Sequence, residues 1–299
     1  MKIIIIGSEG FIGSHLVTYF IKKGWDISGI DLVDHPRQKY SYTKISRLSP
    51  EFDELFGKNQ FDICINAAGN GNVSFSVEHP VMDFEANVLD TIKLLDTIKR
   101  FNPSCKYMHL SSAAVYGNPR QLPVREDDYC EPVSPYGWHK LISENICKEY
   151  YQIYNIPTII LRPFSVYGPG LRKQLIWDLY AKLKASSEVI LFGTGEESRD
   201  FIYIEDLVIA IHIIIEKAIF NAPCYNIACG EEITIENICY LFNSFLDATR
   251  NIRFNQEIRK GDPINWRANI NKLKELGFSP TVKLEDGLRQ TFEWLQSET

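Results

Sequence analysis

Three side chains whose types suit proton transfer, Ser112, Tyr136 and Lys140, occur near the middle of the sequence. Tyr136 and Lys140 have the i, i+4 spacing that places two side chains on one face of a helix. A free tyrosine has a pKa of about 10, too high for a base at neutral pH, but a nearby ammonium group favours the phenolate. The pattern therefore predicts that Tyr136 is a general base and acid, and that Lys140 lowers its pKa.

Ser112 follows a predicted strand, Lys106–Ser111. In an open α/β sheet, ligands bind beyond the carboxyl ends of the strands. We therefore expect Ser112 to hydrogen-bond the substrate hydroxyl group from which Tyr136 takes a proton. Each feature alone has an ordinary explanation, a surface helix pair or a serine that caps a turn, and their combination favours the catalytic interpretation.

A glycine-rich turn, residues 7–13, lies between the first predicted strand and the first predicted helix. It contains Gly7, Gly10 and Gly13, with Phe11 and Ile12 between the last two glycines. The spacing GxxGxxG meets the same need as GxGxxG, namely a tight turn and close backbone approach to a diphosphate. Backbone N–H groups at a helix N-terminus attract such an anion. The turn therefore predicts dinucleotide binding, with a plain packing turn as the alternative.

An acidic residue, Asp31, ends the second predicted strand, eighteen residues after Gly13. There it can accept hydrogen bonds from the adenosine ribose hydroxyls, and it would repel a 2′-phosphate, which favours NAD over NADP. Arg37 and Lys39 lie nearby in sequence and leave NADP open as the alternative. The side chain of Glu9, inside the glycine turn, is expected to point to solvent.

The segments that must position these groups alternate between apolar strands and helices. The predicted strands are Ile3–Ile6, Asp26–Ile30, Phe61–Asn66, Lys106–Ser111 and Thr158–Leu161, and the helices are Phe11–Lys23, about 81–101 and Pro135–Tyr154. Strands that are apolar throughout indicate a sheet covered on both faces. We therefore expect an α/β fold with a doubly wound, Rossmann-type parallel sheet and a smaller mixed α/β lobe. Residues 1–163 would bind NAD and residues 164–299 mainly substrate, with some later segments returning to the first domain.

Composition excludes several other classes of protein. The net charge is −6 and no basic stripe occurs, so no nucleic-acid partner is expected. The seven cysteines and six histidines are scattered, which predicts reduced thiols, no metal site and a cytoplasmic location. The apolar runs are too short for a membrane span, and the first one lacks the features of a signal peptide.

Nearly the whole chain resembles the extended short-chain dehydrogenase/reductases, and within them the NAD-dependent sugar-nucleotide epimerases and dehydratases of the UDP-glucose 4-epimerase type. The ordered motifs that carry the resemblance are the glycine turn, Asn66-Ala67-Ala68-Gly69, Asn87, SSAAVYG at 111–117, YGWHK at 136–140, RPFSVYGPG at 162–170, GTGEESRDF at 193–201, YNIA at 225–228 and RKGDP at 259–263. That many motifs in one order are specific to this family.

The resemblance implies roles for residues on the cofactor side. Ala67, Ala68 and Asn87 would contact NAD. Lys140 would hold the cofactor ribose, and Tyr136 would also lie against the cofactor. Ser112 would orient the sugar hydroxyl group.

The resemblance also implies a nucleotide-sugar substrate. Arg199, Arg259 and Asp262 match positions that hold the nucleotide, and charged forks suit a diphosphate. Ser165 stands where the family commonly has Asn, which puts one contact to the diphosphate or the sugar in doubt. Trp266 would limit the room beside the sugar and so favour a plain hexose over an N-acetylated one. The alternatives are a salt bridge at the domain seam for Arg199 and a packed core position for Trp266.

The residues after Ser112 narrow the reaction. The 4,6-dehydratases of this family carry Asp-Glu directly after this serine or threonine, whereas this chain has Ala113 and Ala114, which cannot transfer a proton. A 4-epimerase that passes through a transient 4-keto sugar is favoured, because Asp31 favours NAD. A 4-ketoreductase or dehydrogenase would use the same residues, and the short chain favours it slightly. A non-catalytic relative would normally have lost the tyrosine or the lysine.

The helices predicted at about 81–101 and 135–154 bear on assembly. In the family that this chain resembles, the corresponding helices pair across a two-fold axis into a four-helix bundle. The resemblance therefore implies a homodimer.

Overall fold

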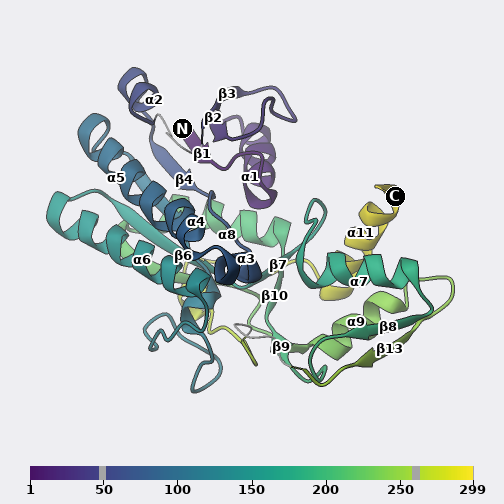
Figure 1. Ribbon diagram of the computed structural model, residues 1–299. Helices are drawn as coiled ribbons and strands as arrows, with labels where there is room; N and C mark the ends of the chain where they lie inside the picture. Colours follow the sequence, from purple (N-terminus) through teal and green to yellow (C-terminus); the bar gives the residue numbers. More distant parts are fainter. Residues whose placement is uncertain (47–51, 258–262, 299) are drawn as a thin grey trace.

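A computed structural model describes residues 1–46, 52–257 and 263–298. Its centre is a seven-stranded sheet in which all paired neighbours are parallel, in the order β11-β6-β5-β4-β1-β2-β3. The strands are β1 Lys2–Ile6, β2 Asp26–Asp31, β3 Ser41–Lys44, β4 Ile63–Asn66, β5 Lys106–Leu110, β6 Thr158–Pro163 and β11 Asn221–Ile227. The chain starts in the middle of the sheet and winds outward in both directions, which confirms the predicted doubly wound α/β fold (Figure 1).

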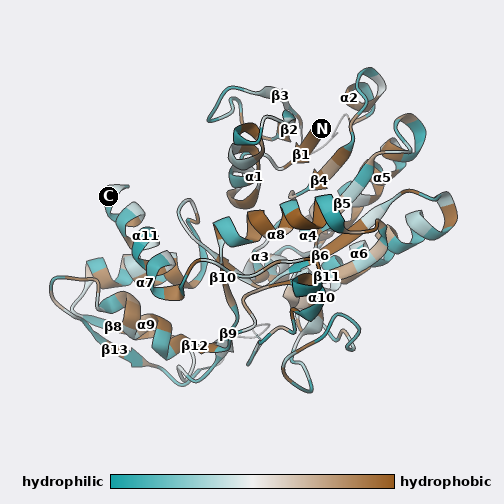
Figure 2. Cartoon of the chain, turned by 180° about the vertical axis from the view of Figure 1, so that it is seen from behind, coloured by the Kyte–Doolittle hydropathy of each residue, from teal (hydrophilic) through white to brown (hydrophobic). Residues whose placement is uncertain are grey.

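Helices cover both faces of this sheet. One face packs on α1 Phe11–Lys22 and α8 Ile204–Lys217, and the other on α2 Phe52–Lys58, α5 Asp90–Phe101 and α6 Pro135–Tyr154. Figure 2 shows α8, largely hydrophobic, crossing the sheet. Strand β1 explains why both faces need cover: Ile3 and Ile5 enter one apolar cluster, while Ile4 and Ile6 enter the other. Alternate side chains of a strand point to opposite faces, so an all-isoleucine strand must be buried on both.

The predicted long helix at about 81–101 is interrupted. It consists of α4 Pro80–Phe84, a π-helical turn η1 Glu85–Leu89, and α5, preceded by α3 Val73–Glu78. Asn87 lies in the π turn, where its backbone carbonyl accepts hydrogen bonds from the hydroxyl groups of Thr91 and Ser143. Such π turns are frequent at functional sites because they insert one extra residue into a helix. The apolar pattern of the sequence does not reveal this insertion.

Helix α6 spans the range predicted from the sequence, because both of its ends are encoded locally. The Ser134 side chain accepts a hydrogen bond from the Gly137 N–H, and Pro135 occupies the first turn. This is a preferred start for a helix. At the other end Asn155 adopts a left-handed conformation (φ 58°) that ends the helix. Tyr136 and Lys140 therefore lie in the first turns of a well-defined helix.

The second half of the chain forms most of a smaller lobe. It also contributes a strand and a helix to the first domain. The lobe contains the parallel pair β8 Glu188–Leu191 and β13 Asn251–Phe254, with α7 Gln174–Ala185, α9 Ile235–Asn243 and α11 Leu284–Ser297. Figure 1 shows this lobe to one side of the sheet. Short elements connect the two parts: the 3-10 turn η2 Ala113–Tyr116, β7 Ser165–Tyr167, β9 Ser198–Arg199, β10 Phe201–Tyr203, β12 Ile233–Thr234 and α10 Asn271–Glu275. Strand β11 pairs with β6, and α8 packs on α1, so segments of this half complete the first domain.

Candidate active site

The glycine turn forms a close-packed bend between β1 and α1. Gly7 has a φ of 78°, and a β-carbon there would lie 2.8 Å from the Ala68 nitrogen. A β-carbon on Gly13 would collide with the Gly7 carbonyl oxygen. Within the described chain, no side chain caps the N-terminus of α1, and its first turn, which begins at Phe11 and Ile12, contains no acidic residue. Backbone N–H groups at this helix end therefore offer a site for an anion such as a diphosphate.

Asp31 lies where β2 ends, and it is tied to the glycine turn. One carboxylate oxygen of Asp31 accepts a hydrogen bond from the Glu9 N–H at 2.8 Å, and the other accepts one from the Leu32 N–H. The expectation that Glu9 points to solvent is wrong: its side chain is buried, at 6% exposure. It accepts hydrogen bonds from the Arg37 N–H and the Tyr40 hydroxyl, because the segment between β2 and β3 folds over the turn and supplies both donors.

The loop after β4 passes close to the Lys140 side chain. Ala67 and Ala68 follow the strand, and Gly69 has a φ of 118°. A β-carbon on Gly69 would lie 2.5 Å from Asn87 Oδ1 and 3.4 Å from Lys140 Nζ, so only glycine lets the backbone pass so closely. Asn87 Oδ1 is buried and has no partner among the described residues, while its Nδ2 donates to the Asp83 carbonyl at 3.0 Å. An unpaired buried acceptor indicates a position for a ligand donor.

Ser112, Tyr136 and Lys140 lie together at the carboxyl end of β5. Ser112 Oγ accepts a hydrogen bond from the Ala114 N–H at the start of η2, and the Ser112 side chain lies close enough to Tyr136 to lower the pKa of its phenol. Lys140 Nζ lies 5.9 Å from the centre of the Tyr136 ring and donates to the Leu110 carbonyl at 2.9 Å. The three residues predicted from their types and spacing therefore share one site.

Burial dominates the protonation of this site. It raises the pKa of Tyr136 to about 12, although the hydrogen bond with Ser112 lowers it, and the negative charge of Asp83 raises it further. Burial also lowers the pKa of Lys140 to about 8, while Asp83 raises it. The expected net lowering of the tyrosine pKa is not found: burial dominates, and Lys140 is not among the groups that shift this pKa. Lys140 still keeps most of its charge at pH 7.

The substrate side is only partly described. Ser165 begins β7, and its N–H donates to the Asp200 carbonyl. Arg199 lies with its guanidinium 5.5 Å from the centre of the Trp266 ring and donates to the carbonyls of Ser198 and Ile264. Two further predicted substrate residues, Arg259 and Asp262, lie outside the described residues.

Trp266 is a packed residue with 8% of its surface exposed. Its indole N–H donates to the Gly117 carbonyl at 3.0 Å, and its ring lies edge-on to Phe164. Ala113, which stands where a dehydratase would have an acid, is buried in the same apolar cluster. The indole therefore packs against η2 and presents little of its surface for contact with a ligand.

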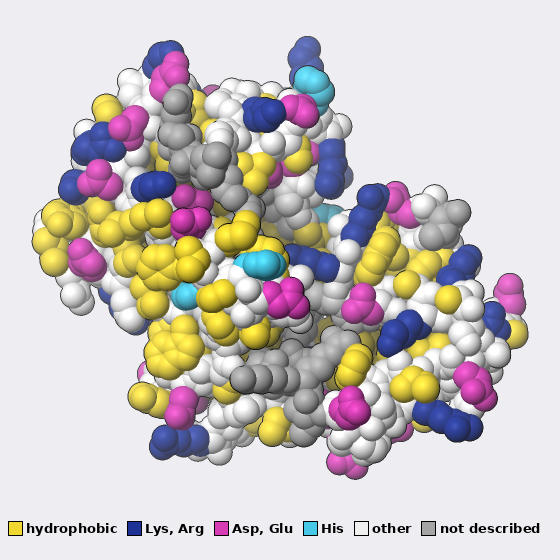
Figure 3. Space-filling view, viewed as in Figure 1, with side chains coloured by type: hydrophobic (Ala, Val, Ile, Leu, Met, Phe, Trp, Pro, Cys, Tyr) yellow, Lys and Arg dark blue, Asp and Glu magenta, His cyan; other side chains and the backbone are white. Residues whose placement is uncertain are grey.

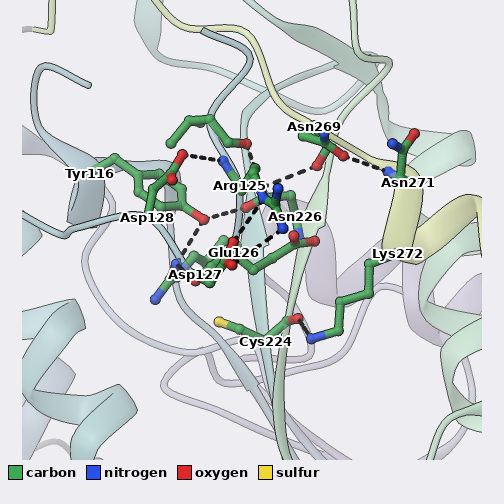
Figure 4. Close-up of polar contacts among 12 residues, drawn as sticks. Tyr116, Arg125, Glu126, Asp127, Asp128, Cys224, Asn226, Asn269, Asn271 and Lys272 are labelled. Atoms are coloured by element: carbon green, nitrogen blue, oxygen red, sulfur yellow. Dashed lines mark hydrogen bonds and ion pairs between the residues drawn. The ribbon is translucent and has the colours of Figure 1, made fainter. Parts of the chain in front are cut away.

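Residues to which the sequence analysis gives no role support the segment around η2. Arg162 on β6 forms a two-pronged ion pair with Glu144 on α6, at 2.7 and 2.9 Å, and both are buried. Arg162 also donates to the Tyr116 hydroxyl, which in turn donates to Asn226 Oδ1 on β11 at 2.6 Å. Figure 4 shows Asn226 joined to Tyr116, Glu126 and Asn269. No local pattern marks Glu144 as the partner of Arg162, because eighteen residues separate them.

The described residues contain no cluster of three or more His, Cys, Asp or Glu side chains that could hold a metal ion. None of the described helices is both long enough and apolar enough to cross a membrane.

The geometry defines a Rossmann-type dinucleotide site beside a Ser-Tyr-Lys group, and comparison with known proteins names the family. The model of the NAD dependent epimerase/dehydratase family matches residues 3–228. The chain belongs to this family. The close glycine contacts, the uncapped start of α1 and the unpaired Asn87 oxygen fit the NAD that the family uses.

Individual relatives match along their full length. A putative UDP-glucose 4-epimerase of Methanocaldococcus jannaschii is 28% identical over 99% of this chain and 98% of its own. A dTDP-glucose 4,6-dehydratase of Salmonella typhimurium is 26% identical over 100% of this chain and 94% of its own. Among solved structures, UDP-glucuronic acid 4-epimerase from Bacillus cereus, in complex with UDP-glucuronic acid and NAD, has a TM-score of 0.91 and 27% identity, with 100% of both chains covered. UDP-N-acetylglucosamine 4-epimerase from Methanobrevibacter ruminantium has a TM-score of 0.89 and 26% identity, covering 100% of this chain and 99% of that one.

Proposed function

We propose that this protein is an NAD-dependent 4-epimerase of a nucleoside-diphosphate sugar, acting through a transient 4-keto intermediate. The observation that carries the proposal is the site itself: Ser112, Tyr136 and a buried Lys140 lie together at the carboxyl end of β5, and the two residues after Ser112 are alanines. The site can move the proton of one hydroxyl group, and it lacks the acid–base pair that water elimination needs. The similar 4-epimerase structures support the same reaction.

The reaction follows from what each side chain can do. Ser112 orients the sugar 4-hydroxyl group, and Tyr136 accepts its proton and later returns it. Lys140 supplies a positive charge that stabilises the tyrosine in its phenolate form. When bound, NAD supplies a reversible hydride acceptor, so the sugar carbon passes through a ketone with no net oxidation. Burial raises the pKa of Tyr136 to about 12, so formation of the phenolate at pH 7 is costly without further stabilisation.

The remaining site residues divide between the two ligands. We propose that NAD is held by Gly7, Gly10, Phe11, Ile12 and Gly13 at the diphosphate, by Asp31 at the adenosine ribose, and by Ala67, Ala68, Asn87, Tyr136 and Lys140 at the nicotinamide end. We propose that the nucleotide sugar contacts Ser112, Ser165, Arg199, Arg259, Asp262 and Trp266. Residues 1–163 would then form mainly the cofactor domain, and residues 164–299 mainly the substrate lobe.

The decisive experiment follows the sugar and the cofactor together. Purified protein with NAD is incubated with UDP-glucose, UDP-galactose, their N-acetylated forms and UDP-glucuronic acid, and the products are identified by NMR while absorbance at the NADH band is recorded. We expect interconversion of C4 epimers without accumulation of NADH. Stoichiometric NADH would instead establish a dehydrogenase. Activity confined to 4-keto-6-deoxy sugar nucleotides with NADH or NADPH would establish a 4-ketoreductase, and a 4-keto-6-deoxy product would establish a dehydratase.

We further propose that the protein is a homodimer that pairs through α4 and α6. Large hydrophobic side chains are exposed on these helices: Val81, Met82, Phe84, Trp138 and Ile142. Figure 3 shows hydrophobic side chains gathered on this side of the molecule. Patches of this kind on soluble proteins commonly mark an interface. Trp138→Glu should shift the light-scattering mass toward the monomer, whereas Ile219→Glu, at an exposed position outside the patch, should not. A wild-type protein that is already monomeric would contradict the proposal.

We also propose a cytoplasmic location and a role in polysaccharide biosynthesis. Epimerised sugar nucleotides are donors for glycosyl transfer, and all seven cysteines are free, which suits a reducing compartment. Cell fractionation tests the location. Loss of one sugar from the cell's polysaccharide after deletion of the gene tests the role, and an unchanged sugar composition would count against it.

A further inference from the structure

An acidic side chain is buried inside the glycine turn. The Glu9 side chain is 4% exposed. Its Oε2 accepts a hydrogen bond from the Arg37 N–H at 3.0 Å, and its Oε1 accepts one from the Tyr40 hydroxyl group, which also hydrogen-bonds Ser8 Oγ. A β-carbon on Gly29 would lie 2.5 Å from the Tyr40 ring, so β2 leaves room for this contact. Glu9 therefore holds the segment between β2 and β3 over the glycine turn.

The same carboxylate forms an ion pair with the arginine that follows β2. Arg37 Nε lies 3.7 Å from Glu9 Oε2, while the Arg37 side chain is 66% exposed. Both the backbone N–H and the guanidinium group of Arg37 are thus directed to one acidic side chain. An arginine near the end of the second strand is the residue type that accommodates the 2′-phosphate of NADP. The ion pair with Glu9 therefore engages the cation that would otherwise suit NADP.

Glu9 is also joined to the residue proposed to bind the adenosine ribose. The Glu9 N–H donates to Asp31 Oδ2 at 2.8 Å, and the Leu32 N–H donates to Asp31 Oδ1. The backbone of Glu9 thus fixes the carboxylate of Asp31 beside the turn, and its side chain adds a second carboxylate to the same region. A 2′-hydroxyl group would find hydrogen-bond acceptors here, whereas a 2′-phosphate would meet negative charge.

We propose that Glu9 is a specificity-determining residue for the cofactor: its carboxylate repels the 2′-phosphate of NADP and keeps Arg37 from binding it, so that NAD is preferred. The proposal rests on the NAD site of the function proposed above, and not on epimerisation itself. Asp31 alone would leave the guanidinium group of Arg37 free to bind a phosphate.

Three variants separate the charge of Glu9 from its packing. Glu9→Gln removes the charge and keeps an oxygen that accepts hydrogen bonds. Tyr40→Phe removes one hydrogen bond to Glu9 and leaves the charge in place. Asp26→Asn is the matched control, because Asp26 is an exposed carboxylate at the opposite end of β2. Circular dichroism verifies that each variant is folded.

The readout is the ratio of the dissociation constants of NADP and NAD, measured by calorimetric titration without a sugar nucleotide. Both cofactors contain the same diphosphate, so an effect of Glu9 on the turn itself cancels in this ratio. We expect Glu9→Gln to lower the ratio at least about tenfold, the size of one charged hydrogen bond. Tyr40→Phe and Asp26→Asn should leave the ratio unchanged.

A second set of variants tests the part played by Arg37. Added to Glu9→Gln, Arg37→Ala should restore the preference for NAD, whereas Lys39→Ala, at an exposed position two residues further on, should not. In the wild-type background Arg37→Ala should leave NADP affinity nearly unchanged, because Glu9 already engages the guanidinium group. A large loss of NADP affinity in that single variant would show that Arg37 binds the 2′-phosphate in spite of Glu9, and would overturn the proposal without any change at Glu9.

The remaining outcomes are also decisive. An unchanged ratio in Glu9→Gln, or an equal fall in Tyr40→Phe, would overturn the role of the Glu9 charge. A fall that persists in the double variant Glu9→Gln/Arg37→Ala would overturn the role of Arg37. If the wild-type protein binds NAD but interconverts no epimers, the proposed reaction fails while the titrations still decide the role of Glu9. If neither cofactor binds, the NAD site and the role of Glu9 are both refuted.

Discussion

The two sides of the active site are built by different means. On the proposed cofactor side the backbone dominates at the diphosphate: the glycine turn, the start of α1 and the loop after β4 approach one another closely because β-carbons are missing at Gly7 and Gly13. The proposed substrate side draws on side chains from β7, β9 and the segment after residue 262, which come together only through the fold of the smaller lobe. The first kind of site tolerates little change in shape, whereas the second can change its ligand by single substitutions.

The largest effect on kcat is expected at Tyr136, which lies between the proposed cofactor and substrate sides. Tyr136→Phe removes the proton acceptor and should lower kcat by about 10²- to 10⁴-fold. NAD affinity, measured by fluorescence titration, should change little, because the aromatic ring of residue 136 and all other residues proposed to hold NAD remain. Tyr19→Phe, a tyrosine on α1 that hydrogen-bonds His212, serves as the control. Full activity of Tyr136→Phe would show that the site has been assigned wrongly.

The next largest effect is expected on the free energy of unfolding, through the buried ion pair of Arg162 and Glu144. Glu144→Gln leaves the buried Arg162 guanidinium without its charged partner, and it should lower the free energy of unfolding by about 3–5 kcal/mol. The exposed pair of Lys99 and Asp96 offers the comparison: Asp96→Asn should cost less than about 1 kcal/mol. Denaturant titration measures both. Equal losses would mean that the buried pair gains nothing from its position.

A smaller effect is expected on the cofactor side alone. In Gly13→Ala the new β-carbon meets the Gly7 carbonyl, and the strain should cost about 1–3 kcal/mol in the turn and weaken NAD binding accordingly. Gly57→Ala in α2 is the control, because its β-carbon would make only ordinary contacts. Calorimetric titration with NAD measures the difference. Unchanged affinity in Gly13→Ala would argue against diphosphate binding at this turn.

The smallest effect is expected on the substrate side. Arg199→Ala should raise the KM for the sugar nucleotide by about tenfold, which corresponds to about 1.4 kcal/mol and is at the low end of what one charged hydrogen bond contributes. The NAD affinity should stay the same, and this contrast with Gly13→Ala is the sharpest test of the division between the two sides. Arg289→Ala, on the surface of α11, is the control. A loss of NAD affinity in Arg199→Ala would contradict the division of the site into a cofactor side and a substrate side.

The sequence predicts best what is encoded locally. The strands at the centre of the sheet, helix α6 and the group of Ser112, Tyr136 and Lys140 all follow from short patterns of residue types. Strand β3 is not predicted, since it is a partly polar edge strand with three exposed residues out of four in its burial pattern. The position of Glu9 is predicted wrongly because its donors lie 28 and 31 residues away.

Long-range pairs mark the limit of prediction. The side chains of Asp83 and His139 hydrogen-bond each other although they are 56 residues apart, and neither belongs to a pattern that would reveal the other. The sequence around each residue indicates nothing unusual: Asp83 is an acidic residue near the start of a helix, and His139 is a histidine within a helix. Only the packing of α4 on α6 brings them together and removes the carboxylate from water.

The pairing of β11 with β6 also has a consequence for synthesis of the chain. Arg162 and Tyr116 emerge from the ribosome long before Asn226, which completes their hydrogen bonds. Domains generally fold as units as they are made, so here the catalytic half must wait, with its last strand missing, until α7 and α8 have been translated. The sheet beside the Tyr-Lys site thus becomes complete only after α7, β8 and α8 have been made, so a nascent chain that stalls before β11 would expose the edge of β6.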